Sequence, residues 1–171
     1  MTNLLKLPAF NGDALHVVVE SPRGSTLKFK YDSHLDVMSL TRPLPAGLAY
    51  PHDWGFVPST KAADGDPLDA VIMWDGISYP GIVIACRLIG VLKVEQTNLQ
   101  SRKRERNDRI AVLPIKAPRW DSVRTVFDVS ERTRLELQQF FTAAVAFEGK
   151  EIAILGWAGP DEALTVAREA A

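Results

Sequence analysis

The sequence predicts an α+β domain that contains a small closed β-barrel and ends in two helices. Apolar stretches rich in β-branched residues fill the first two thirds of the chain, and helical periodicity appears only after residue 130. A nearly continuous apolar run at 81–95 is typical of a strand buried on both faces or curved around a barrel. The chain has 171 residues, of which 46% are apolar and 24% charged, which suits a single domain, 1–171, with a sizeable core.

The first part of the chain predicts three strands and one stiff loop. Strands are expected at 15–20, 27–31 and 36–40, and alternation in the second places its two lysines on one face. A solvated strand face is the alternative for those lysines. Residues 43–60 contain four prolines and two glycines, which indicates a structured loop. Its aromatic and polar side chains suit the wall of a pocket, or a satellite hydrophobic cluster beneath a long loop.

The remaining elements follow from periodicity and from helix-start residues. Gly90 is expected to mark a bend in the long strand. Residues 96–108 are polar and basic, which predicts an exposed loop with solvated charges. Ser130 resembles a helix start. The other expected strands are 70–74, 81–95, 109–114 and 151–157, and the helices are 130–145 and 160–170.

Residues 64–69, Asp-Gly-Asp-Pro-Leu-Asp, place three carboxylates directly before a predicted buried strand. Like charges this close repel one another and raise one another's pKa unless a cation joins them. A hard divalent cation such as Mg²⁺ or Mn²⁺ prefers these oxygen ligands. A solvated turn in which Asp side chains bond their own backbone is the alternative. An EF-hand loop fits poorly, because the third Asp occupies the position that requires Gly.

Composition excludes several other classes of protein. The net charge of −1 gives the chain no bulk affinity for nucleic acid or anionic membranes. Cys86 is the single cysteine and lies in an apolar run, so it is expected to be buried rather than nucleophilic. The longest apolar run is too short to span a bilayer, and the N-terminal residues lack the apolar stretch of a signal peptide. We therefore expect a cytoplasmic protein with no membrane partner, and the net charge disfavours a nucleic-acid partner.

Several blocks of the sequence resemble the family I soluble inorganic pyrophosphatases, in the order that the family has them. The resemblance covers nearly the whole chain. It implies a five-stranded barrel of the oligonucleotide-binding type with flanking helices, usually assembled into hexamers in bacteria. It also implies Mg²⁺-dependent hydrolysis of pyrophosphate to two phosphates, with Mn²⁺ as a possible substitute. The blocks are 19–22, 27–29, 41–42, 50–58, 64–69, 79–81, 90–93, 140–141 and 156–157.

The resemblance assigns roles to the acidic residues. Asp66 would be the general base that orients the attacking water, and it would also contact metal. Asp64 and Asp69 would bind the first metal ions, and Glu20 would hold an outer one. Carboxylates suit this work because bound metals neutralise the substrate and lower the pKa of a bridging water.

Four further residues would bind the substrate. The resemblance implies that Lys28, Arg42 and Tyr50 contact phosphate oxygens, as cations and a hydroxyl donor should. Arg109 stands where the family has a phosphate-binding Lys, and we include it among the substrate-binding residues.

The sequence also departs from the family pattern. Lys30 replaces a Glu, and Gln96 and Asn107 stand where two metal-binding Asp residues are expected. The family's Tyr-Lys pair becomes Ala144-Val145, and Trp54 replaces a Tyr. The pattern therefore predicts fewer metal ions and weaker activation of water.

Two features of the same region leave alternatives open. Glu95 or Asp108 would partly compensate for the missing acids if the register slips by one residue. The basic segment 102–106 would add protein cations if it folds into the site.

Three functions are consistent with these residues. The first is a pyrophosphatase with reduced Mg²⁺-dependent activity. The second is a related hydrolase of another phosphoanhydride or phosphoester, with room for a larger leaving group at 144–145. The third is a binder of nucleotide or single-stranded nucleic acid that uses the segment 102–106, which the net charge disfavours.

Overall fold

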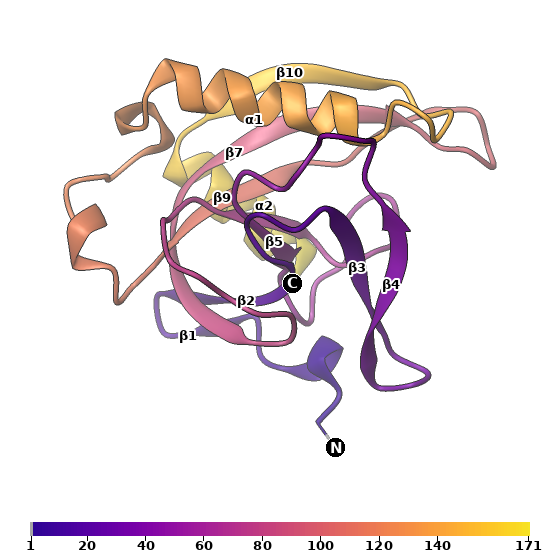
Figure 1. Cartoon of the computed structure of the whole chain (residues 1–171). Helices are drawn as coiled ribbons and strands as arrows, with labels where there is room; N and C mark the ends of the chain where they lie inside the picture. The colour runs from indigo at the N-terminus through magenta and orange to yellow at the C-terminus, as the bar shows by residue number, and fades with distance from the viewer. Residues whose placement is uncertain (1) are drawn as a thin grey trace.

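The barrel is formed by five strands that close on themselves (Figure 1). The computed structural model describes residues 2–171, so residue 1 of the expected domain lies outside the described residues. Among the strands of residues 2–171, only β6 and β9 pair in parallel, and β2 also pairs with β7, which closes the circuit. The predicted α+β class with a five-stranded barrel is confirmed. The five strands, in pairing order, are β2 (Ala14–Ser21), β5 (Asp53–Phe56), β6 (Asp69–Ile72), β9 (Arg109–Pro114) and β7 (Val83–Thr97).

Additional strands extend the barrel at its edges. The short β1 (Phe10–Asn11) pairs with β2, while β8 (Arg104–Arg106) and β10 (Ile152–Ala158) pair with β7. A separate hairpin of β3 (Leu27–Asp32) and β4 (Val37–Pro43) stands beside the barrel (Figure 1). Three short 3₁₀ helices occupy connections, at Leu4–Lys6, Pro118–Trp120 and Val126–Asp128.

Both C-terminal helices begin where the sequence predicts. In α1 (Glu131–Ala144), the Ser130 Oγ accepts the Thr133 N–H at 3.1 Å, which satisfies one free donor of the first turn. The second helix, α2 (Pro160–Ala170), has Pro in its first turn, where the missing N–H costs nothing. No helix between residues 2 and 171 has both the length and the apolar character to cross a membrane.

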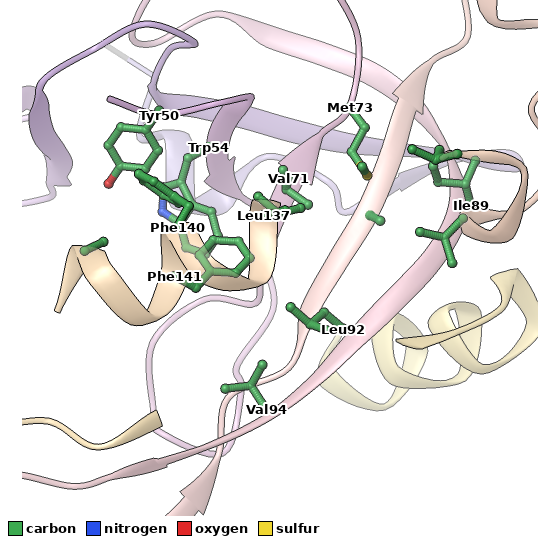
Figure 2. Packing of buried hydrophobic residues seen from close by; sticks show 14 of the residues in the cluster. Tyr50, Trp54, Val71, Met73, Ile89, Leu92, Val94, Leu137, Phe140 and Phe141 are labelled. Carbon is green, nitrogen blue, oxygen red and sulfur yellow. The ribbon is translucent and has the colours of Figure 1, made fainter. Parts of the chain in front are cut away.

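Helix α1 packs against the loop that precedes β5 and against β5 itself. Figure 2 shows Phe140 and Phe141 beside Tyr50 and Trp54. The ring centroids of Tyr50 and Phe140 lie 5.0 Å apart, and those of Trp54 and Phe141 lie 5.3 Å apart. Each buried aromatic ring contributes about 1.5–3 kcal/mol through apolar burial. This packing fixes the C-terminal end of α1 over the loop.

Gly90 lies at an irregularity of the long strand, as predicted. The register between β7 and β9 shifts between Leu88 and Gly90. A Cβ at position 90 would lie 2.6 Å from the Ala158 carbonyl oxygen and 2.7 Å from Val126 Cγ1. The bend therefore depends on a residue without a side chain.

Two sequence predictions of local structure were wrong. The stiff loop 43–60 contains strand β5, whose backbone groups are paired by β2 and β6 on either side. The exposed loop expected at 96–108 contains β8. Each of these elements depends on partner strands that are distant in sequence. The strand expected at 36–40, ending in 41–43, is confirmed as β4.

Asp53 is one of the polar residues of the loop 43–60 that were expected in the wall of a pocket. It anchors that loop instead. Its side chain is fully buried and accepts the Arg23 N–H at 2.8 Å and the Trp74 indole N–H at 2.7 Å. A buried carboxylate depends on such donors, because the lost hydration must be replaced.

We expect Trp74→Phe to lower the free energy of unfolding by about 1.5–3 kcal/mol, the value of a hydrogen bond to a charged group. Trp120→Phe is the matched control, because its indole bonds the Asp75 carboxylate, whose side chain is 42% exposed. The control should cost less than about 1 kcal/mol. Equal losses in urea unfolding of the two variants would contradict the anchoring role of Asp53.

Candidate functional site

One cavity of about 270 Å³ collects charged side chains from five separate parts of the chain. Four carboxylates and four cations line it, together with apolar and amide side chains. Such a concentration of unlike charges around one cavity is typical of a site for a charged ligand. The charged lining residues are Glu20, Lys28, Lys30, Asp64, Asp66, Asp69, Arg109 and Lys150.

The acidic loop reaches this cavity through a tight turn. Gly65 has a φ of 88°, a conformation that Gly adopts without strain. The Asp66 N–H donates to the Asp64 Oδ1 at 3.1 Å, so one of the three acids does bond its own backbone. Asp69 is the first residue of β6, which places its carboxylate at the rim of the barrel. All three acids line the cavity.

Burial raises the pKa of three acids in this cavity, Glu20, Asp64 and Asp69. Glu20 is 6% exposed and accepts the Tyr31 N–H at 2.9 Å, yet burial raises its pKa to about 7. Burial raises the pKa of Asp69 to about 6, against the opposing effect of the Arg109 guanidinium and the Lys28 ammonium. The pKa of Asp64 is also raised, first by burial. Deprotonated acids in such a setting are stabilised when positive charge arrives.

Arg109 supplies a buried cation with free donors. It pairs with Asp69 in the parallel register of β6 and β9 and is 5% exposed. Its guanidinium carbon lies 4.2 Å from the Phe141 ring centroid and 5.6 Å from that of Trp54. Within residues 2–171, its Nε and Nη1 atoms have no hydrogen-bond partner. Buried guanidinium donors without partners indicate a position for an anion.

A smaller cavity of about 50 Å³ shares Lys28 and Arg109 with the first. Arg42 and Tyr50 line this smaller cavity and not the larger one. Burial raises the pKa of Tyr50 to about 12, so its hydroxyl remains a donor. The structure thus gathers all eight residues that the sequence nominated, in two adjoining compartments.

Arg42 is held by the end of α1. Its Nη2 donates to the Ala144 carbonyl oxygen at 2.8 Å, and its Nε lies 3.2 Å from Glu148 Oε1. The carbonyl at a helix C-terminus and the carboxylate together orient the guanidinium.

Gln96 and Asn107 form a neutral wall of the larger cavity. Their side chains are 6% and 7% exposed, and the Asn107 Nδ2 donates to the Gln96 Oε1 at 2.9 Å. Two carboxylates here would repel one another without a cation, whereas the amides satisfy each other. This wall therefore has no need of a metal ion.

Neither alternative acid reaches the cavity. Asp108 accepts the Val94 N–H at 3.0 Å, pairs with Arg106 at 2.8 Å and lines a different cavity together with Arg106. Glu95 alternates with Gln96 along β7 and is not among the lining residues. The compensation by register slip is therefore not realised. The lining of the cavity, as far as residues 2–171 show, also contains no residue of the basic segment 102–106.

Lys150 also lines the cavity, although its sequence context did not predict this. This residue precedes β10 and lines the cavity near Val145, and its ammonium is close enough to Lys28 to contribute to the lowered pKa of that lysine. No local signal marks it, because a single Lys in a Gly-containing turn is usually a solvated residue.

The donor chemistry of the acidic loop fits a divalent cation. Among residues 2–171, no group of three His, Cys, Asp or Glu side chains is already arranged to hold a metal ion. However, Asp64, Asp66 and Asp69 offer hard oxygen donors to one cavity, and the pKa of two of them is raised. The neutral wall of Gln96 and Asn107 does not fit a second cation in the same way.

Comparisons with known proteins agree across nearly the whole chain. Residues 17–171 match the family described as "Inorganic pyrophosphatase". The inorganic pyrophosphatase of Thermus thermophilus is 36% identical over 175 residues, which cover 98% of this chain and 95% of that protein. The Synechocystis sp. enzyme of the same name is 33% identical over 168 residues, with 98% and 96% covered.

Solved structures give the same result. The crystal structure of the inorganic pyrophosphatase from Thermus thermophilus aligns with a TM-score of 0.91 at 33% identity, and the alignment covers 99% of this chain and 97% of that one. The Helicobacter pylori inorganic pyrophosphatase aligns with a TM-score of 0.87 at 30% identity, with 96% of each chain covered.

Proposed function

The chain belongs to the family I inorganic pyrophosphatases, and on this basis we propose that it hydrolyses pyrophosphate to two phosphates with Mg²⁺ or Mn²⁺. The observation that carries the proposal is the shared cavity, in which carboxylates face buried cations. Pyrophosphate and a divalent cation together need both kinds of group.

We assign the acids to the cation and to the water. Asp64 and Asp69 would hold the cation, and Glu20, the buried carboxylate of the same cavity, would support it. A bound divalent cation would neutralise phosphate charge and lower the pKa of a water. Asp66, whose side chain is 59% exposed, orients the attacking water and accepts its proton.

The cations and the phenol hold the substrate. Arg109 and Lys28 lie between the two compartments and contact the phosphate oxygens. Tyr50 donates its hydroxyl hydrogen, and Arg42 lines the same compartment and offers the N–H donors that Pro43, Ala144 and Glu148 do not occupy. These fixed donors orient the substrate before reaction, which is the main means of stabilising phosphoryl transfer.

We expect the neutral wall of Gln96 and Asn107 to give a lower turnover than two carboxylates at these positions would give. Activation of water by metal ions is an electrostatic effect, so each missing carboxylate ligand lowers it. Homo-oligomeric assembly, with a hexamer implied by the family resemblance, and a cytoplasmic location remain predictions.

We expect phosphate release from pyrophosphate in the presence of Mg²⁺ or Mn²⁺ and none after chelation with EDTA. The reason is that protein cations alone leave no activated water. Continuous phosphate detection, with the Thermus thermophilus enzyme measured beside it, tests both the activity and its reduction. Release that persists in EDTA, or no release with either cation, would contradict the proposal.

Val145 supports a second candidate function. It lines both compartments with an apolar side chain, so this side holds a substituent better than a second phosphate. A related hydrolase of substituted phosphoanhydrides would show turnover of nucleoside diphosphates above that of pyrophosphate.

A further inference from the structure

Lys30 makes a direct ion pair within the cavity. Its Nζ lies 2.7 Å from Asp66 Oδ2, and the two side chains are 49% and 59% exposed. Within the described residues, no ion pair joins any other cation of the cavity to one of its carboxylates. The carboxylate of Asp66, to which we assign the attacking water, is therefore already paired with an ammonium group of the protein itself.

The position of Lys30 is central to the acids. The Asp66, Glu20 and Asp69 charges all act to raise the pKa of its ammonium, and that ammonium in turn acts to lower the pKa of Asp64. The Lys30 ammonium interacts electrostatically with all four carboxylates, and a metal ion would favour the same position.

The neutral wall of the same cavity does not offset this cation. Gln96 and Asn107 are bonded to each other and carry no charge. An incoming divalent cation therefore meets the ammonium of Lys30 without extra carboxylates to compensate for the repulsion.

We propose that Lys30 is a resident counter-ion that occupies Asp66 in the free protein, so that a divalent cation binds in this cavity by displacing the ammonium from Asp66 Oδ2. The inference rests on the proposed cation site and is independent of turnover. The affinity for the cation then depends on Lys30, which lies on the β3–β4 hairpin and not on the acidic loop.

Mn²⁺ titration of the substrate-free protein, followed by the electron paramagnetic resonance of free Mn²⁺, tests the inference. Lys30→Met should tighten Mn²⁺ binding roughly fivefold, which is about the most that a partly exposed ion pair contributes. Lys30→Arg keeps the charge and should remain within about twofold of the wild type. Lys150→Met is the matched control, since it removes a cavity cation that makes no ion pair with Asp66.

The partner residue gives the sharper test. In an Asp66→Asn background, Lys30→Met should no longer change the affinity for Mn²⁺, because the competition takes place at Asp66. Equal tightening in Lys30→Met and Lys150→Met, or no tightening in Lys30→Met, would overturn the inference while leaving the proposed function intact. Absence of Mn²⁺ binding in every variant would overturn both.

Discussion

Asp66→Asn is expected to reduce turnover of pyrophosphate by about 10²–10⁴ at saturating cation, the usual contribution of a positioned general base. Asn has nearly the same shape but does not accept a proton from water. Its amide oxygen still accepts a hydrogen bond from Lys30, and the side chain at this position is 59% exposed. The free energy of unfolding should therefore change by less than about 1 kcal/mol.

The dependence on cation concentration separates a base from a metal ligand. Asp64→Asn should raise the concentration of Mg²⁺ needed for half-maximal rate, and excess Mg²⁺ should recover part of the rate. In Asp66→Asn, excess Mg²⁺ should restore binding of the cation but not the rate, because the lost base is not replaced. Asp13→Asn, an exposed acid outside the cavity, is the control. Turnover of Asp66→Asn above about a tenth of the wild-type value would exclude Asp66 as the base.

Local pattern was sufficient for the parts of the site that depend on one segment. Strand alternation predicts that Lys28 and Lys30 share a face, and both line the cavity. The acidic loop lies before a buried strand because Gly and Asp favour the turn and the apolar residues after it favour the core. The two helices were predicted within one residue at most of their ends, because capping residues and proline mark them.

Contacts between segments that are distant in the sequence could not be predicted from local pattern. Asp53 and its strand lie in a proline-rich loop, and only the partner strands show that the strand forms. The hydrogen bond of Asn107 to Gln96 joins β7 to the residue that follows β8, and the sequence shows two neutral residues but not their contact. The ion pair of Lys30 with Asp66 likewise joins a hairpin to a loop 36 residues away. Contacts of this kind arise from packing in space and leave no periodic signal.

The neutral wall leads to the second large expected effect. In the double variant Gln96→Asp, Asn107→Asp, two buried carboxylates replace a hydrogen-bonded amide pair. Without a cation they repel one another, and we expect the free energy of unfolding to fall by about 2–4 kcal/mol. A divalent cation that joins them should reverse the loss, because binding at 100 times its dissociation constant stabilises a protein by about 2.7 kcal/mol.

Thermal unfolding with and without Mn²⁺ measures this reversal directly, without relying on turnover. The double variant should show a lower midpoint than the wild type in EDTA and a much larger increase on addition of Mn²⁺. The single variant Asn107→Asp is the matched control, because the Gln96 amide can rotate to donate to one carboxylate and satisfy it without metal. Its response to Mn²⁺ should therefore be smaller than that of the double variant. If the double variant responds no more than the wild type, the two new carboxylates do not hold a cation between them. The neutral wall would then not account for the smaller number of metal ions that the sequence predicts, and Lys30, which already pairs with Asp66, would be the remaining explanation.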